Sequence, residues 1–282
     1  MEKIHTYEQY DEVLADFKKG KAKCSTNKIF MRDELTALID AGKLFYQEID
    51  GTLWFFSNEG YFYRADFFVP ANIPIRLHRQ DMAVLTELTG SETRYNVQWE
   101  QELIAAGYEK RDKYLGHSSQ LDECIDDIKK KSEILHTFFT TRGCTYRKAA
   151  KTDLPEIWML WEDKLGKHTY TLNSIPDAEL DEMERHGRCD VICDSEGNII
   201  AASMYLRKKA VAHGLHTATY YEGSGLGAAV LYRSMAHAYQ EGCKKFAVWV
   251  REDNLASTKL IRHIFAPTGK FFRQFVLCPD RK

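Results

Sequence analysis

A glycine-rich segment, YYEGSGLGAAVLY at residues 220–232, places three glycines within five positions between a strand-like stretch and a helical one. Gly223, Gly225 and Gly227 permit positive φ and remove Cβ atoms, so a bulky ligand can approach the backbone. The amides at the start of the following helix, together with its dipole, favour a negative charge. We interpret residues 223–228 as a turn that binds a diphosphate, and a glycine-rich turn without a ligand is the alternative.

The same residues also match the dinucleotide pattern G-x-G-x-x-A, with Glu252 at the end of the next strand. A doubly wound sheet needs several more strand–helix units after the first one. Only about 30 residues follow Glu252, and a β meander precedes the loop, so this interpretation fails on topology. A Walker P-loop is excluded because no Gly-Lys-Ser/Thr follows.

Charge and composition narrow the class of protein. The 282 residues carry a formal net charge of −2, so neither nucleic acid nor an anionic membrane is an expected partner. No apolar run approaches the ~20 residues that cross a bilayer, and the N-terminus MEKIHTYEQYDEV lacks the apolar core of a signal peptide. We expect a cytoplasmic protein. Its seven cysteines include no C-x-x-C pair, which favours reduced thiols and no metal site.

Turn and helix signals predict an α+β fold in two halves. In the first half, a helix at 27–42 precedes three strands with a hairpin at Asp50-Gly51, then a strand, a helix and a strand. A charged periodic stretch at 118–139 predicts a connecting helix. The second half repeats this order, which indicates two related domains. The predicted organisation is a first domain at 1–118, a connecting helix at 119–143 and a second domain at 144–282.

The second half resembles a GNAT-type N-acetyltransferase over about 144–277. The resemblance rests on a strand, the loop E-G-S-G-L-G, a long helix, a buried strand ending in VREDN, and the short helix LASTKLIRHIF. The opening YRKAAKTDLPEIWMLW is also similar to that family. The resemblance implies two GNAT-like domains, each a mixed, mainly antiparallel twisted sheet flanked by helices. The first half has no glycine loop, so it would be a degenerate copy that supplies part of an acceptor cleft or an interface.

The resemblance also implies which residues bind acetyl-CoA. The amides of the loop and helix start would hold its pyrophosphate, namely those of Gly223, Ser224, Gly225, Leu226, Gly227 and Ala228. Thr217 and Thr219 would lie beside the pantetheine arm and the acetyl carbonyl, and Asn254 and Ser257 near the far side of the cofactor. Glu222 stands where the family has Arg or Gln. Its carboxylate would weaken binding unless it points away or pairs with a cation, whereas its amide would still serve.

Acetyl transfer to an amine needs a neutral amine, a polarised carbonyl and a protonated thiolate. His213 and His216 precede the loop, where the family often carries its base, and an ordinary pKa of ~6.5 suits that task. Being three residues apart on a strand, they should point to opposite faces, so at most one faces the cleft. His216 is the better candidate because it is nearer the expected acetyl group. A structural histidine is the alternative for each.

The family often has a tyrosine in its last helix that protonates the leaving thiolate, and the matching position here is Ile261. Tyr221 is the first candidate for this role, and Tyr220 and His263 are substitutes. A packing role is the alternative for either tyrosine. Four carboxylates crowd residues 176–187 and predict either an acidic lip for a cationic amine or a solvated helix face: Glu179, Asp181, Glu182 and Glu184.

The leading hypothesis is therefore an N-acyltransferase, an enzyme that moves an acetyl group from acetyl-CoA to the amine of a small molecule by direct attack. A catalytically silent module that binds acyl-CoA is one alternative. A tandem aminoacyl transferase that uses charged tRNA is another, and the net charge of −2 argues against it. A homodimer stays open.

Overall fold

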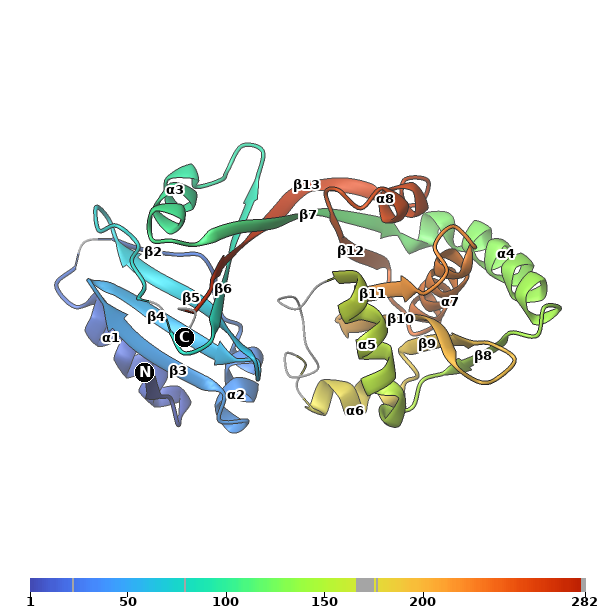
Figure 1. Cartoon of the computed structure of the whole chain (residues 1–282), viewed down its shortest axis with the longest axis horizontal. Coiled ribbons are helices and arrows are strands. Elements are labelled where there is room, and N and C mark those ends of the chain that lie inside the picture. Colours follow the sequence, from blue (N-terminus) through green and yellow to red (C-terminus); the bar gives the residue numbers. More distant parts are fainter. Residues whose placement is uncertain (22, 79, 166–174, 176, 280–282) are drawn as a thin grey trace. The chain divides into compact units, whose positions relative to one another are not determined.

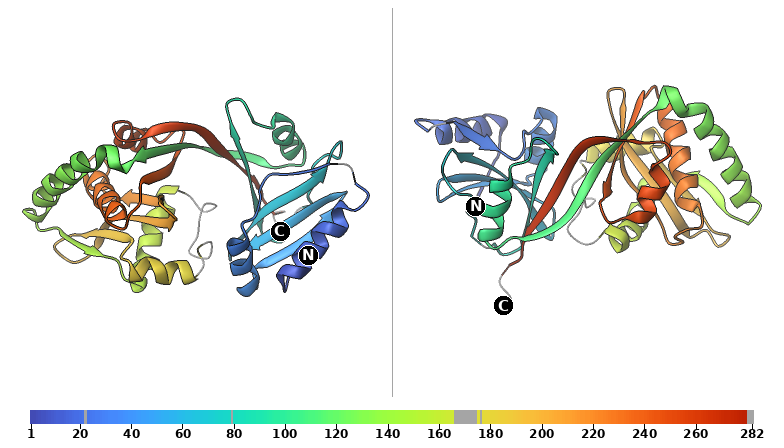
Figure 2. Two further views of the ribbon diagram at one scale, coloured as in Figure 1. Left: turned by 180° about the vertical axis from the view of Figure 1, so that it is seen from behind. Right: turned by 90° about the horizontal axis from the view of Figure 1, so that it is seen from above.

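A computed structural model describes residues 1–21, 23–78, 80–165, 175 and 177–279. The chain divides into two compact units (Figure 1). Unit 1 comprises Met1–Tyr114 and Lys270–Lys282, and unit 2 comprises Leu115–Gly269. Each unit can be followed from other directions in Figure 2. Among the described residues, no helix has both the length and the apolarity that a membrane crossing requires.

Unit 1 is built on a mixed sheet with the strand order β1-β3-β4-β5-β6-β13, and β2 pairs with β5. Its elements are β1 (Glu2–Lys3), α1 (Tyr7–Lys18), β2 (Cys24–Thr26), α2 (Arg32–Asp40), β3 (Leu44–Ile49), β4 (Thr52–Asn58), β5 (Phe62–Pro70), β6 (Ala83–Ser91) and α3 (Val97–Ala105). Strands β7 (Glu109–Gln120) and β13 (Ala266–Leu277) continue from one unit into the other. Strand β5 is buried along its whole length, because helices cover both faces of the sheet.

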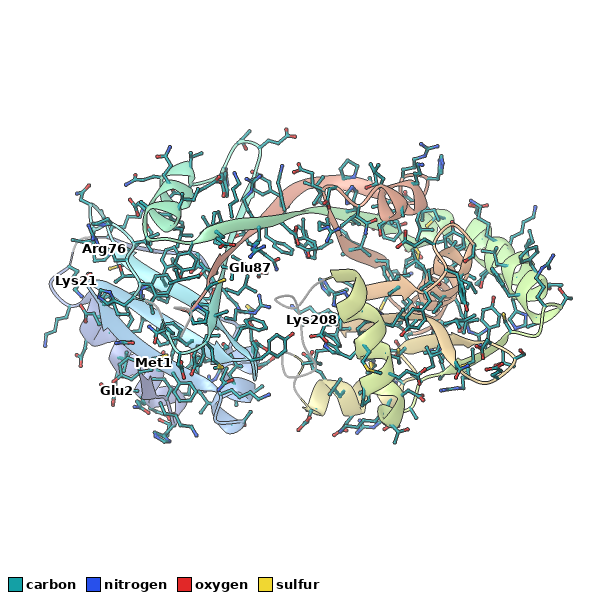
Figure 3. All side chains as sticks on the ribbon, in the orientation of Figure 1. Met1, Glu2, Lys21, Arg76, Glu87 and Lys208 are labelled. Atoms are coloured by element: carbon teal, nitrogen blue, oxygen red, sulfur yellow. The ribbon has the colours of Figure 1, made fainter. Side chains whose placement is uncertain are left out.

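Strand β13 is held in unit 1 by its ladder and by side chains. Lys270–Leu277 pairs antiparallel with Val84–Ser91 of β6. Glu87 on β6, labelled in Figure 3, accepts a hydrogen bond from Gln274 Nε2 (2.9 Å) and pairs with Arg64 of β5 (2.8 Å). The predicted second domain, 144–282, includes residues 270–277. In the structure these residues belong to unit 1.

Unit 2 has the strand order β7-β12-β11-β10-β9-β8. Strands β11 and β12 pair in parallel, whereas β10 pairs antiparallel with β11 and β9, and β9 with β8. Its elements are α4 (Leu121–Thr140), β8 (Thr145–Lys148), a 3₁₀ turn (Lys151–Asp153), α5 (Leu154–Leu165), α6 (Asp177–Arg185), β9 (Cys189–Cys193), β10 (Ile199–Lys208), β11 (Val211–Thr219), α7 (Leu226–Gln240), β12 (Lys245–Arg251) and α8 (Leu255–Ile261).

Helices cover both faces of the unit 2 sheet. On one face, α5 and α6 pack on Ala202 and Met204 of β10 through a core that includes Trp161. On the other face, α4, α7 and α8 pack on Tyr205 and Phe246. Helix α4, predicted as a connecting helix, belongs to this layer, and its first amide, on Leu121, donates to the carbonyl of Lys244 (2.9 Å). All seven cysteines are free thiols.

Gly214 lies on β11 next to the side chains of Phe246 and Val248 on the neighbouring strand β12. A Cβ at this position would come within 2.8 Å of Phe246 Cε1 and 2.9 Å of Val248 Cγ1. Real Cβ atoms do not approach carbon atoms that closely, and both partners are confined by the core of unit 2. The close approach of the two strands therefore depends on a glycine here.

We predict that Gly214→Ala lowers the unfolding free energy by about 1–3 kcal/mol, because the added methyl group overpacks this contact. Urea denaturation followed by circular dichroism measures the change. Gly227→Ala is the matched control, since its Cβ would meet ordinary contacts at 3.9 Å and 4.0 Å. Equal stability of the Gly214→Ala protein and the native protein would contradict the prediction.

Candidate functional site

The loop between β11 and α7 is exposed and turns on two glycines. Gly223 has φ 76° and Gly225 has φ 90°, both in the left-handed region that other residues adopt at a cost. Gly225 is the N-cap of α7, and no side chain caps the helix from that position. The helix therefore begins with amides that its own cap residue does not satisfy.

Two amides at this helix start have partners within the chain. Leu226 donates to Ser224 Oγ (3.3 Å) and Ala229 donates to the carbonyl of Gly225 (3.0 Å). Within the described structure, no acceptor bonds the amides of Gly223, Gly225, Gly227 or Ala228. We call these four amides the amide cradle. Such a group of donors at a helix N-terminus is suited to an anion.

No side chain fills the amide cradle from within the described structure. A Cβ on Gly223 would meet no atom within 4 Å, and residues 220–224 are exposed. Beneath the loop, the virtual Cβ of Gly225 lies 3.8 Å from Phe139 Cζ and 4.0 Å from Leu135 Cδ2 of α4. The side chains of α4 therefore support the turn at Gly225, and its other side, at Gly223, is exposed to water.

Helix α7 is tied to the sheet by Asp190 of β9, a fully buried residue that sequence reasoning missed. Its carboxylate accepts hydrogen bonds from Arg233 Nε and Ser234 Oγ of α7, each at 3.0 Å, and pairs with Lys148 of β8 at 2.9 Å. An aspartate within the apolar strand CDVIC was the available signal, because a charge inside such a strand needs a partner.

A second buried cluster holds the C-terminal end of α7. Glu241 accepts from Arg188 Nε (2.9 Å) and from the Tyr205 hydroxyl (2.7 Å), and that hydroxyl also contacts His237 Nδ1 (2.9 Å). Burial opposes ionisation of Glu241, but the hydrogen bonds from Arg188 and Tyr205 outweigh it and lower the pKa of this carboxyl. The helix is therefore anchored by polar contacts at its middle and at its end.

Strands β11 and β12 pair only over a short length. Their parallel register runs from Val211↔Lys245 to His213↔Ala247 and ends there. Beyond it, β11 stays paired with β10 as far as Thr219↔Ala201. The edge of residues 214–219 that faces away from β10 thus carries backbone groups outside the β12 ladder, and this edge leads to the amide cradle.

The prediction that His213 and His216 point to opposite faces is wrong. His213 pairs with Leu206 and His216 pairs with Met204, which are two residues apart on β10 and share a face. Leu215 has no partner in this register, so it is the extra residue of a β-bulge that shifts the alternation by one. Both histidines lie on the face that α5 covers.

His216 packs against aromatic rings of α5. Its ring centroid lies 4.8 Å from that of Trp161 and 6.0 Å from that of Trp158. Burial lowers the pKa of His216 to about 4, so its imidazole is neutral at pH 7. His213 is more exposed. Burial, followed by the charges of Lys208 and Lys245, also lowers its pKa.

The two threonines lie on the opposite face of β11, beneath α7. The hydroxyls of Thr217 and Ser203 are 2.9 Å apart. Thr219 Oγ1 accepts from the amide of Tyr221 (3.1 Å), and its methyl group lies 3.9 Å from the virtual Cβ of Gly227. Thr219 therefore lies beside the amide cradle, whereas the hydroxyl of Thr217 contacts that of Ser203 on the neighbouring strand β10.

Asn254 begins α8, as predicted. Its Oδ1 accepts from the amide of Ser257 (2.9 Å), which is a helix N-cap. Leu260 of the same helix lies 4.0 Å from the virtual Cβ of Gly227, so α8 borders the amide cradle. Ile261 is buried in the core of unit 2.

The remaining candidates lie on the surface. Tyr220 is 46% exposed and Tyr221 is 56% exposed, and Glu222 is also exposed. His263 Nε2 accepts from Arg262 Nε (2.9 Å). On α6, Asp181 pairs with Lys151 of the preceding 3₁₀ turn at 2.6 Å.

Acidic residues of α6 thus have partners of their own, which favours the solvated face over an acidic lip. Glu182 pairs with Arg185 on the same helix, and Glu184 accepts from the amide of Lys151 (2.8 Å). Within the described ranges, no three His, Cys, Asp or Glu side chains gather as metal ligands would.

Comparison with known proteins agrees with this geometry. Residues 154–265 match the acetyltransferase (GNAT) family. A tandem GNAT protein from the clavulanic acid biosynthesis pathway is similar over 100% of this chain and 98% of its own, with TM-score 0.55 and 9% identity. No curated protein matches the sequence.

Two further solved structures share the fold. A GCN5-related N-acetyltransferase from Sphaerobacter thermophilus is similar over 80% of this chain and 76% of its own (TM-score 0.51, 11% identity). A glucosamine N-acetyltransferase region of a fungal GH3 β-N-acetylglucosaminidase covers 98% of this chain and 38% of its own (TM-score 0.54, 10% identity). The predicted resemblance and fold class are confirmed: residues 154–265 form a domain of the acetyltransferase (GNAT) family, in a chain with the fold of a tandem GNAT protein.

Proposed function

We propose that unit 2 is an N-acyltransferase domain that transfers an acetyl group from acetyl-CoA to a small-molecule amine. The observation that carries the proposal is the amide cradle, four main-chain donors without an acceptor in the described structure, placed at the positive end of α7. Membership of residues 154–265 in the acetyltransferase family supports the same reaction class.

The residues present fit a pyrophosphate. The amide cradle offers N–H donors without a bulky side chain at Gly223 or Gly225, and the dipole of α7 adds a positive potential. Glu222, which stands where the family has Arg or Gln, is exposed to water. Water screens its charge, so its effect on a bound anion is smaller than that of a buried carboxylate.

The open edge of β11 suits the pantetheine arm. This arm is extended and carries two amides, and it can pair with a strand edge as an added strand does. From Thr219 back to Gly214 the edge is about 17 Å long at the usual rise per residue. An arm that runs along it from the amide cradle brings the acyl end to the bulge at Leu215, beside His213 and His216.

The two histidines supply neutral imidazoles on one face. The pKa of each is lowered, so both imidazoles are neutral at pH 7, and the same lowering makes each a weaker base than an ordinary histidine. We assign His216 the role of proton acceptor from the attacking amine, because it follows the bulge directly, and His213 is the second candidate. Acetyl-CoA, when bound, would supply the activated thioester. Ile261 lies in the core, and Tyr221 lies beside the amide cradle at the pyrophosphate end of this path, so the departing thiolate at the acyl end takes its proton from water.

Gly227→Asp tests the amide cradle. A Cβ at this position would meet only ordinary contacts at 3.9 Å and 4.0 Å, and a carboxylate is favourable at the start of a helix, so we expect the protein to fold with native stability. The same carboxylate repels a pyrophosphate, so we expect affinity for acetyl-CoA to fall at least about tenfold. Isothermal titration calorimetry measures affinity, and thiol release across a panel of amines measures transfer.

Gly227→Asn is the matched control, because it adds similar bulk without the charge and should lose less affinity. Native affinity in the Gly227→Asp protein, or no binding of any acyl-CoA to the native protein, would overturn the proposal. Binding of acetyl-CoA without thiol release for any amine would favour the silent binding module.

A pH series tests the lowered pKa of His216. The unfolded chain protonates this histidine as pH falls through 6.5, whereas the folded chain resists until about 4, so stability is complete above pH 6.5 and is lost toward pH 4. Relative to His216→Gln, the native protein should lose about 3 kcal/mol of unfolding free energy over this window. Urea denaturation of both proteins at pH 7.5, 6.5, 5.5 and 4.5 measures the unfolding free energy. If it falls equally with pH in both proteins, the lowered pKa of His216 is contradicted.

A further inference from the structure

The C-terminal end of α4 carries an exposed aromatic–cation pair next to the amide cradle. Phe138 is 43% exposed, although it is a large apolar side chain on a helix surface. The guanidinium of Arg142 lies 3.6 Å from the centroid of its ring, and Arg142 Nη1 donates to the carbonyl of Phe138 (2.8 Å). Across the described chain, Arg142 forms no ion pair, so its charge is not neutralised by a carboxylate.

A short chain of contacts connects this pair to the loop. The ring of Phe139 meets that of Phe138 edge-on, with centroids 5.0 Å apart, and Phe139 Cζ lies 3.8 Å from the virtual Cβ of Gly225. Phe139 is buried whereas Phe138 is exposed, so one ring supports the turn and the next one faces water. The exposed ring thus lies one aromatic ring away from the N-cap of α7.

Helical spacing places the pair on the outer side of α4. The opposite flank of the helix meets β8, where His136 contacts the ring of Tyr146 (centroids 4.6 Å apart) and the carbonyl of Leu135 accepts from the Tyr146 hydroxyl (3.3 Å). Phe138 and Arg142 are four residues apart and share a flank. That flank is the one that faces away from β8.

We infer that Phe138 and Arg142 bind the adenosine end of coenzyme A, with adenine stacked on the pair and the 3′-phosphate beside the guanidinium. This inference rests on the proposed function. A pyrophosphate in the amide cradle leaves the adenosine outside the loop, and an exposed aromatic ring with a stacked arginine is a surface on which a base stacks. An unpaired cation complements the charge of the 3′-phosphate.

Three ligands test the adenine contact and the 3′-phosphate contact separately: coenzyme A, dephospho-coenzyme A, which lacks the 3′-phosphate, and 4′-phosphopantetheine, which lacks the whole 3′-phospho-AMP part. We expect Phe138→Ala to weaken coenzyme A by about tenfold, the effect of losing a base–aromatic stack, and to leave 4′-phosphopantetheine unchanged. We expect Arg142→Gln to reduce the preference for coenzyme A over dephospho-coenzyme A by about fivefold. Calorimetry on the full-length protein measures each affinity.

Ile134→Ala is the matched control, because Ile134 is 59% exposed on the same helix one turn earlier and should not alter any affinity. Phe138→Tyr keeps the ring and should keep native affinity. If coenzyme A binds to Phe138→Ala as tightly as to the native protein, the inference is overturned and the proposed function stands. If the native protein binds none of the three ligands, both are overturned.

Discussion

The ion pair and hydrogen bonds of Asp190 are the interaction on which the candidate site depends. A buried carboxylate is costly unless charged or hydrogen-bonded partners surround it. Here two of its partners, Arg233 and Ser234, come from successive positions of α7, and the third, Lys148, comes from β8. These contacts define the rotation and the height of α7 over the sheet. The direction of the amides at its N-terminus follows from them.

The polar contacts of α7 are distributed unevenly along it. Its middle is bound to Asp190, and its C-terminal end is bound through Glu241 to Arg188 and Tyr205. Its N-terminus lacks a side-chain cap from Gly225. In natural proteins, departures from local stabilising patterns such as helix capping occur mainly at functional sites. In α7 the backbone amides without a partner are those at the N-terminus, where an anion would bind.

Local signals predicted the parts of the fold that local chemistry decides. The glycine loop, the long helix after it and the Asn254 cap all follow from short-range rules, and the structure has each of them at the expected place. The first helix, Tyr7–Lys18, was missed because half of its residues are charged or polar and its buried positions are few.

The remaining differences arise from pairing between distant segments. The bulge at Leu215 depends on how β11 meets β10, and no residue type announces it, so the common face of His213 and His216 could not be read from alternation. The partner of the last strand likewise depends on a register with β6, which is far away in sequence. The order of elements along the chain alone therefore predicted that the last strand belongs to the second domain, which is nearer in sequence.

The placement of Lys270–Leu277 has a consequence for biosynthesis. The segment that completes the sheet of unit 1 emerges from the ribosome only after every residue of unit 2 has been made. Unit 2 is continuous in sequence and can therefore fold first on the nascent chain. Until β13 has been made, the edge of β6 that pairs with it has no partner strand. Unit 1 matures last although it is translated first, which reverses the usual N-to-C order of domain folding.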